Sequence, residues 1–209
     1  MTISVVEQII QERIVAIVRL NAYTHALEVA RALQAGGIPI LEFTLTGKGA
    51  IEAIQTVREH QGEQACVGVG TVLTVKDARE ALKAGAQFVV TPVVRPDVIA
   101  ACKEANVPIL CGALTPTEML TAHELGADMI KLFPARQGGP QYLRDILAPL
   151  PFLRVVPTGG IGVENARAFL DAGAVAVGIG GKLISPQAVA SGDWAQITAQ
   201  ARAQVEAIR

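Results

Sequence analysis

The chain has 209 residues, of which 51% are hydrophobic and 18% are charged, and its formal net charge at pH 7 is −1. This composition is typical of a globular chain with a sizeable core. The near-neutral charge gives no reason to expect nucleic acid or an anionic membrane surface as a partner, so any anionic ligand must be held locally.

The three cysteines and the N-terminal segment both bear on where the protein works. Cys66, Cys102 and Cys111 are widely spaced and form no CxxC pair, which argues against a disulfide framework or a zinc site. The N-terminus lacks the pattern of a secretory signal, and no apolar run is long enough to span a membrane. We therefore expect reduced thiols and a cytoplasmic protein.

The dominant pattern along the chain is the alternation of short β-branched runs with alanine-rich helical stretches. The eight runs predict strands at 14–19, 39–45, 66–71, 87–92, 107–112, 128–134, 153–160 and 174–181. The stretches predict helices at 2–11, 24–35, 48–60, 75–84, 96–105, 116–125, 139–147, 163–172 and 193–208. Four of these helices end in similar glycine-containing tetrapeptides, and glycine is the expected residue at such ends.

Eight βα units in one unbroken series predict an α/β fold, a (β/α)₈ TIM barrel. We expect one domain over residues 1–209, with the helix at 2–11 as an extra N-terminal element. A doubly wound sheet is the alternative, but it would need fewer strands, and no GxGxxG follows the first strand. The barrel predicts an active site at the carboxyl ends of the strands.

Lys131 lies within the apolar run DMIKLFPA, and alternation places Met129, Lys131 and Phe133 on one side of the strand. If that side faces the barrel interior, burial favours a neutral amine, which attacks carbonyl carbons and forms a Schiff base. The alternative is a lysine whose head reaches solvent at the strand end. Glu42, in PILEFTL, is either a structural ion-pair partner or a general acid/base beside that amine.

Two glycine pairs follow the last two strands: Gly159 and Gly160 in PTGG, and Gly180 and Gly181 in GIGG. In this fold the loops after strands 7 and 8 commonly bind phosphate, because backbone N–H groups and helix N-termini favour anions. Lys182 could add a direct ion pair. Tight turns without a ligand are the alternative interpretation.

Three more side chains at strand ends are weaker candidates. Arg19 is either an anchor for a substrate carboxylate or a surface arginine, and both interpretations stay open. Thr71 and Thr158 could donate hydroxyl hydrogen bonds to a bound keto acid.

Together, the motifs IVAIVR, LEFTLT, GVGTVLT, TPTE, IKLFPA, PTGGI and GIGG resemble those of the bacterial 2-keto-3-deoxy-6-phosphogluconate (KDPG)/4-hydroxy-2-oxoglutarate (KHG) aldolases. The resemblance covers nearly the whole chain. It implies a class I aldolase that uses Lys131 as the Schiff-base lysine and Glu42 as the general acid/base. It also implies that Thr71, Pro92, Phe133 and Thr158 line the pyruvate end, and that the four glycines bind phosphate.

The resemblance further implies a homotrimer that needs no metal or cofactor. The expected reaction cleaves a 2-keto-3-deoxy-6-phospho sugar acid of the gluconate type to pyruvate and glyceraldehyde 3-phosphate, with KHG as a second substrate giving pyruvate and glyoxylate. Two alternatives remain: the galactonate epimer as substrate, because GGPQYLRDI (138–146) also resembles that branch, and a phosphate-binding barrel enzyme that is not an aldolase.

Three positions depart from the pattern of the family. Thr46 replaces an arginine that many members carry after the glutamate, and we hypothesise that Arg19 supplies the missing guanidinium. Cys111 replaces a proline after the fifth strand, and Lys182 replaces a serine after the last glycines.

Overall fold

The computed structural model describes residues 3–209, and a ring of parallel strands forms its centre. The strands are β1 (Ile14–Val18), β2 (Ile40–Thr44), β3 (Cys66–Gly70), β4 (Val89–Val90), β5 (Ile109–Ala113), β6 (Met129–Leu132), β7 (Val155–Pro157) and β8 (Val177–Ile179). They follow the order β7-β6-β5-β4-β3-β2-β1-β8 in one sheet. All eight predicted strands are present, and each is shorter than predicted, most of all β4, β7 and β8.

A bridge between Thr158 and Gly178 joins β7 to β8 and closes the ring. The N–H of Val175 also donates to the carbonyl of Val155, at 3.0 Å. The predicted (β/α)₈ barrel is therefore confirmed, and the doubly wound sheet, which would leave two open edges, is wrong.

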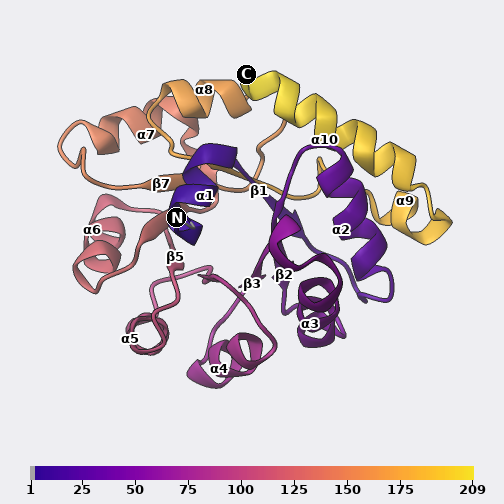
Figure 1. Ribbon diagram of the computed structural model, residues 1–209. Coiled ribbons are helices and arrows are strands. Elements are labelled where there is room, and N and C mark those ends of the chain that lie inside the picture. The colour runs from indigo at the N-terminus through magenta and orange to yellow at the C-terminus, as the bar shows by residue number, and fades with distance from the viewer. Residues whose placement is uncertain (1–2) are drawn as a thin grey trace.

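Helices surround the ring of strands (Figure 1). The nine predicted helices are α1 (Val5–Glu12), α2 (Ala26–Ala35), α3 (Ala50–Gln61), α4 (Val75–Lys83), α5 (Pro96–Glu104), α6 (Pro116–Glu124), α7 (Gly139–Leu147), α8 (Ala166–Asp171) and α10 (Trp194–Ile208). Two 3₁₀ turns, Gly62–Gln64 and Ala135–Gln137, and a short helix, α9 (Pro186–Ser191), were not predicted.

The predicted N-terminal helix is present as α1, with Ser4 and Glu7 forming a capping box at its start. Position 2, where the prediction began, lies outside the described residues. Ile9 of α1 packs with inward-facing residues of the barrel, including Val15 and Ile40. Figure 1 shows α1 lying across one end of the ring. This end is therefore closed by apolar side chains.

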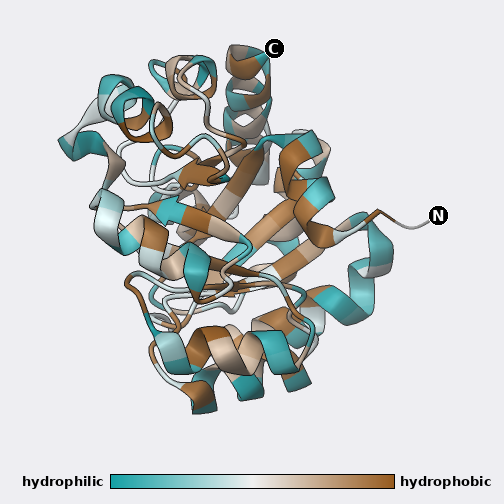
Figure 2. Cartoon of the chain, turned by 90° about the vertical axis from the view of Figure 1, so that its left-hand side faces the viewer, coloured by the Kyte–Doolittle hydropathy of each residue, from teal (hydrophilic) through white to brown (hydrophobic). Residues whose placement is uncertain are grey.

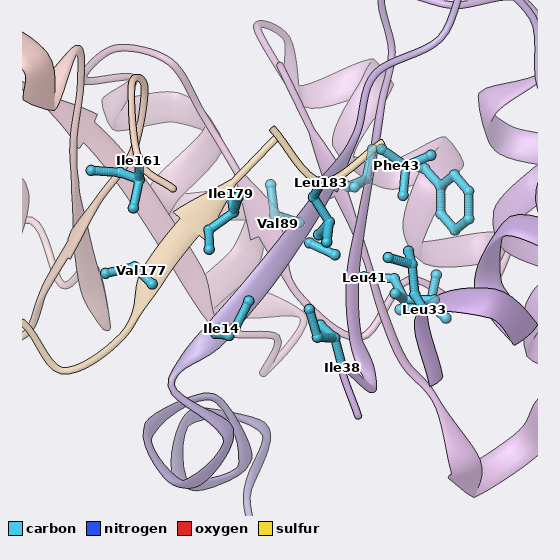
Figure 3. Close-up of a cluster of buried hydrophobic side chains, with 14 of the residues drawn as sticks. Ile14, Leu33, Ile38, Leu41, Phe43, Val89, Ile161, Val177, Ile179 and Leu183 are labelled. Carbon is cyan, nitrogen blue, oxygen red and sulfur yellow. The ribbon is translucent and has the colours of Figure 1, made fainter. Parts of the chain in front are cut away.

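The core has two layers, which follow from the alternation of side chains along each strand. The inner layer fills the barrel and is made of Val15, Ile40, Cys66, Phe88, Val90, Leu110, Met129, Val156 and Ala176. The outer layer lies between the strands and the helices, and Figure 3 shows part of it, including Phe43, Ile179 and Leu183. Figure 2 shows the matching pattern, with apolar strands inside and hydrophilic residues on the outer helix faces.

Candidate active site

Lys131 and Glu42 lie side by side inside the barrel, on β6 and β2. The Nζ of Lys131 is 3.8 Å from Oε1 of Glu42, and only 3% and 2% of the two side-chain surfaces are exposed. Met129, two residues before Lys131, belongs to the inner layer, as the alternation predicted. The lysine therefore does not extend to solvent at the strand end.

Two glycines on β3 leave room for neighbouring buried side chains. A Cβ on Gly70 would collide with the carboxylate of Glu42, and a Cβ on Gly68 would collide with the ring of Phe88. A side chain at position 70 would displace the carboxylate.

The Oε1 atom of Glu42 is buried and has no hydrogen-bond partner among the described residues. At 3.8 Å, its contact with Lys131 is too long for a good hydrogen bond. A buried carboxylate oxygen without a donor is costly, so the site favours a water or a ligand hydroxyl at this atom. The ring of Phe133 borders the same amine, with its centroid 5.4 Å from Nζ.

A cleft of about 560 Å³ lies at the carboxyl ends of β1, β6, β7 and β8, and most of the candidate residues from the sequence line it. These are Arg19, Phe133, Thr158, Gly159, Gly160, Gly180, Gly181 and Lys182. Phe133 and Thr158 directly follow β6 and β7, and the ring of Phe133 also borders the amine of Lys131, which is not itself among the lining residues. The structure therefore brings the two glycine loops and the end of β1 together.

The glycines of the two loops are required for different reasons. Gly159 and Gly160 have φ angles of 93° and 83°, in the left-handed region that side chains rarely adopt. Gly181 needs no such backbone angle, and a Cβ there would meet nothing within 4 Å. Glycine at position 181 therefore leaves the backbone open to the cleft. Ile161 and Leu183, labelled in Figure 3, anchor the two loops in the core.

The basic side chains of the cleft differ in whether a carboxylate pairs with them. Lys182 also borders the cleft, but its Nζ forms a 2.8 Å ion pair with Glu164, which lowers the pKa of that carboxyl through the hydrogen bond it donates. Arg136 lines the cleft as well. The sequence analysis missed Arg136, because an arginine in a loop after a strand carries no pattern of its own.

Thr71 and Pro92 lie apart from this cleft. Thr71 lines a separate depression beside Thr46 and Asp77, and it has a φ of 61°, which is uncommon for a β-branched residue. Pro92 is half-buried, and its backbone contacts Gly112 at the end of β5. Cys111 packs in the outer layer, where burial raises the pKa of its thiol.

Tyr23 ties together the ends of β1 and β2, the strands that carry Arg19 and Glu42. Its hydroxyl oxygen lies 2.8 Å from the carbonyl oxygens of both Val18 and Thr44, which share its single proton. Burial raises the pKa of this phenol. The side chain of Thr44 also contacts Thr46 at 2.9 Å, so Thr46 continues the network.

Comparison with known proteins identifies the family. Residues 5–200 match the family described as KDPG and KHG aldolase. A 2-dehydro-3-deoxy-phosphogluconate aldolase of Treponema pallidum is 37% identical over 94% of both chains. A KHG/KDPG aldolase of Escherichia coli is 35% identical over 92% of this chain and 91% of its own. The chain belongs to the KDPG and KHG aldolase family. It is an aldolase, a carbon–carbon lyase.

Solved structures of similar proteins agree with this assignment to the KDPG and KHG aldolases. A structure described as native KDPGal has a TM-score of 0.87 and 31% identity, over 93% of both chains. The KDPG aldolase of Legionella pneumophila, solved with pyruvate captured as a covalent carbinolamine, has a TM-score of 0.84 and 30% identity over 91% of this chain and 92% of its own. The Zymomonas mobilis enzyme, solved with 3-phosphoglycerate, has a TM-score of 0.84 and 29% identity over 96% and 95%.

Residues 3–209 contain neither a membrane-spanning helix nor a metal-binding cluster. No helix in this range is long and apolar enough to cross a membrane. The same range holds no cluster of three or more His, Cys, Asp or Glu side chains able to hold a metal ion.

Proposed function

We propose that this aldolase cleaves 2-keto-3-deoxy-6-phosphogluconate to pyruvate and glyceraldehyde 3-phosphate through a Schiff base on Lys131. The proposal rests above all on the buried contact between Lys131 and Glu42, which puts an amine and a carboxylate in one desolvated site. The carbinolamine that the Legionella pneumophila relative forms with pyruvate supports the same chemistry here.

The reaction begins when the neutral amine of Lys131 attacks the C2 ketone. The carbinolamine loses water and becomes an iminium, which can accept electrons from the neighbouring bond. Glu42 removes the proton of the C4 hydroxyl, directly or through a water, and the C3–C4 bond breaks. Its electron pair moves onto C3 and forms an enamine, while C4 leaves as the aldehyde carbon.

The second half of the cycle releases pyruvate. The enamine takes a proton at C3 from Glu42, which restores the iminium and the carboxylate. Water then adds to C2, and the bond to Nζ breaks, so that pyruvate leaves and the amine is free again. The unsatisfied Oε1 of Glu42 suits both proton transfers, because no protein donor competes for it among the described residues.

The two ends of the substrate are assigned to the cleft and to the strand ends around it. The loops with Gly159, Gly160, Gly180 and Gly181 hold the phosphate, with Lys182 at their edge. Phe133, Thr158, Thr71 and Pro92 border the pyruvate end. Arg19 holds the carboxylate in place of the arginine missing at Thr46. In this assignment Arg19→Ala raises the KM for pyruvate-derived ligands, and an unchanged KM would reject the role.

Reductive trapping tests the central step. The protein is incubated with pyruvate, treated with borohydride and digested. The mass of the peptide that contains position 131 is then measured by mass spectrometry. We expect a pyruvate-derived adduct on that peptide in the native chain and none in Lys131→Arg, whose guanidinium stays protonated. An adduct on another lysine would assign the nucleophile elsewhere, and no adduct at all would favour a phosphate-binding enzyme without imine chemistry.

The galactonate epimer is the second candidate substrate. The similarity to the structure described as native KDPGal, with 31% identity and a TM-score of 0.87, supports this candidate. A comparison of kcat/KM for the two epimers and for 4-hydroxy-2-oxoglutarate decides among them. We also propose a homotrimer, and light scattering in solution should give the mass of three chains.

A further inference from the structure

All the charged side chains that line the cleft are basic. Arg19, Arg136 and Lys182 are its basic residues, and no aspartate or glutamate is among the lining residues. Lys182 is already paired with Glu164, at 2.8 Å. Within residues 3–209, the guanidinium of Arg136 has no such partner: every ion pair found there joins other residues. The cleft therefore offers an arginine whose charge no protein carboxylate balances.

The backbone fixes Arg136 directly onto the loop after β7. Its N–H donates to the carbonyl of Gly159, at 3.1 Å. A Cβ on Gly160 would lie only 2.8 Å from the Cβ of Arg136, so the root of the arginine side chain packs on this glycine. Gly160 belongs to one of the two glycine loops. The Arg136 side chain therefore leaves the backbone next to the proposed anion site. Arg19, by contrast, follows β1.

Free backbone donors lie at the same place. Within the described part of the chain, the N–H groups of Gly160, Gly181 and Lys182 donate to no backbone carbonyl. Gly181 also has open space where a Cβ would be. Such N–H groups bind phosphate oxygens well, and a nearby guanidinium adds paired, charge-assisted hydrogen bonds.

We propose that Arg136 is the side chain that binds the substrate phosphate, and that it sets the preference of this aldolase for phosphorylated over unphosphorylated 2-keto-3-deoxy acids. Lys182 is the less suitable cation, because Glu164 would have to release it first. This inference rests on the proposed function, since it assigns a residue to the phosphate end of that substrate. It goes further because it assigns different roles to Arg136 and Lys182, which both border the glycine loops.

The test measures how much the phosphate contributes to turnover in three variants. The substrates are 2-keto-3-deoxy-6-phosphogluconate and the same compound without phosphate, and the readout is the ratio of their kcat/KM values. Arg136→Gln should lower this ratio about tenfold, because a charge-assisted contact to the phosphate is lost. Lys182→Gln should lower it less. Arg144→Gln, an exposed arginine on α7 outside the cleft, is the control and should leave the ratio as it is.

Inorganic phosphate is an independent probe of the same site. It should compete with the phosphorylated substrate, and Arg136→Gln should raise its inhibition constant about tenfold. Arg136→Lys should recover part of this binding, because it restores a charge without the paired donors. A general structural defect would lower turnover of both substrates alike and would leave the ratio unchanged.

The possible failures are distinguishable. An Arg136→Gln ratio equal to that of the native chain would overturn the inference while pyruvate trapping on Lys131 still supports the aldolase mechanism. A larger effect in Lys182→Gln than in Arg136→Gln would overturn it too and assign the phosphate to the lysine. Failure of the proposed function would instead appear in the native chain, as absence of the trapped adduct.

Discussion

Two of the lysine–glutamate pairs among residues 3–209 lie in opposite environments. Lys182 and Glu164 are 2.8 Å apart at the surface, with 61% and 48% of their side chains exposed. Lys131 and Glu42 are 3.8 Å apart inside the barrel and almost completely buried. The shorter contact is the one that water screens, and the longer one is isolated from water. Burial, and not the distance between the charges, makes the inner pair suitable for chemistry.

The buried pair of Lys131 and Glu42 (the inner pair) also lacks a hydrogen bond that the exposed pair of Lys182 and Glu164 (the outer pair) has. Glu164 accepts a hydrogen bond from Lys182, whereas Oε1 of Glu42 accepts none among residues 3–209. Burying an amine and a carboxylate away from water costs free energy that a poorly aligned contact does not recover. A site that keeps such a pair is better explained by a reaction than by stability.

The largest expected effect comes from replacing the inner lysine. Lys131→Arg puts a guanidinium beside Glu42 and removes the nucleophilic amine, so kcat should fall at least about 10³-fold. Lys83→Arg, an exposed lysine at the end of α4, is the matched control and should leave kcat unchanged. Initial rates with a coupled pyruvate assay measure both. Substantial turnover in Lys131→Arg would show that the inner pair is structural.

Replacing the inner glutamate should have the next largest effect. Glu42→Gln preserves the size of the side chain but cannot accept the C4 hydroxyl proton, so kcat should fall about 10²- to 10⁴-fold. The pyruvate adduct on Lys131 should still form, because the amine is intact. Glu124→Gln, an exposed residue at the end of α6, controls for the loss of one charge. A fall of kcat in Glu42→Gln that is no larger than in this control would remove Glu42 from the mechanism.

The sequence predicted the inner pair because its local pattern was strong. An isolated charge in a β-branched run is rare, and the period of two along a strand shows which neighbours share its side. The helix ends were equally readable: Gly37, Gly85, Gly126 and Gly173 all have positive φ, as their position after a helix predicted. Thr115, the residue before α6, forms a capping box with Glu118.

What the sequence did not reveal depends on contacts between distant segments. The pairing of Lys182 with Glu164 and the placement of Arg136 on Gly160 follow from how three loops meet. The short helix α9 had readable signals, since Ser185 and Pro186 are favourable at a helix start, but six residues show no periodicity. The role that resemblance predicts for Thr71 stays a prediction, and the depression that Thr71 lines is separate from the cleft of the glycine loops.

Replacing a residue of the outer pair should have the smallest effect, and its effect on stability should depend on pH. The hydrogen bond from Lys182 lowers the pKa of Glu164 below its usual 4.5, so the stability that it contributes is present above that pH. This contribution is lost as the pH falls through the lowered pKa of the folded state, because the carboxylate then takes up a proton in both states. Glu164→Gln should therefore lower the urea midpoint only slightly at pH 7, and the difference from the native chain should vanish in acid.

Urea unfolding at pH 7 and at a pH well below 4.5, followed by circular dichroism, measures this difference. Glu124→Gln again serves as the control, because Glu124 is exposed and pairs with no cation among residues 3–209. A large loss of stability at pH 7 would mean that the outer pair holds the loop after β8 in place. Lys182 would then be structural, and this would strengthen the case for Arg136 as the cation that binds phosphate.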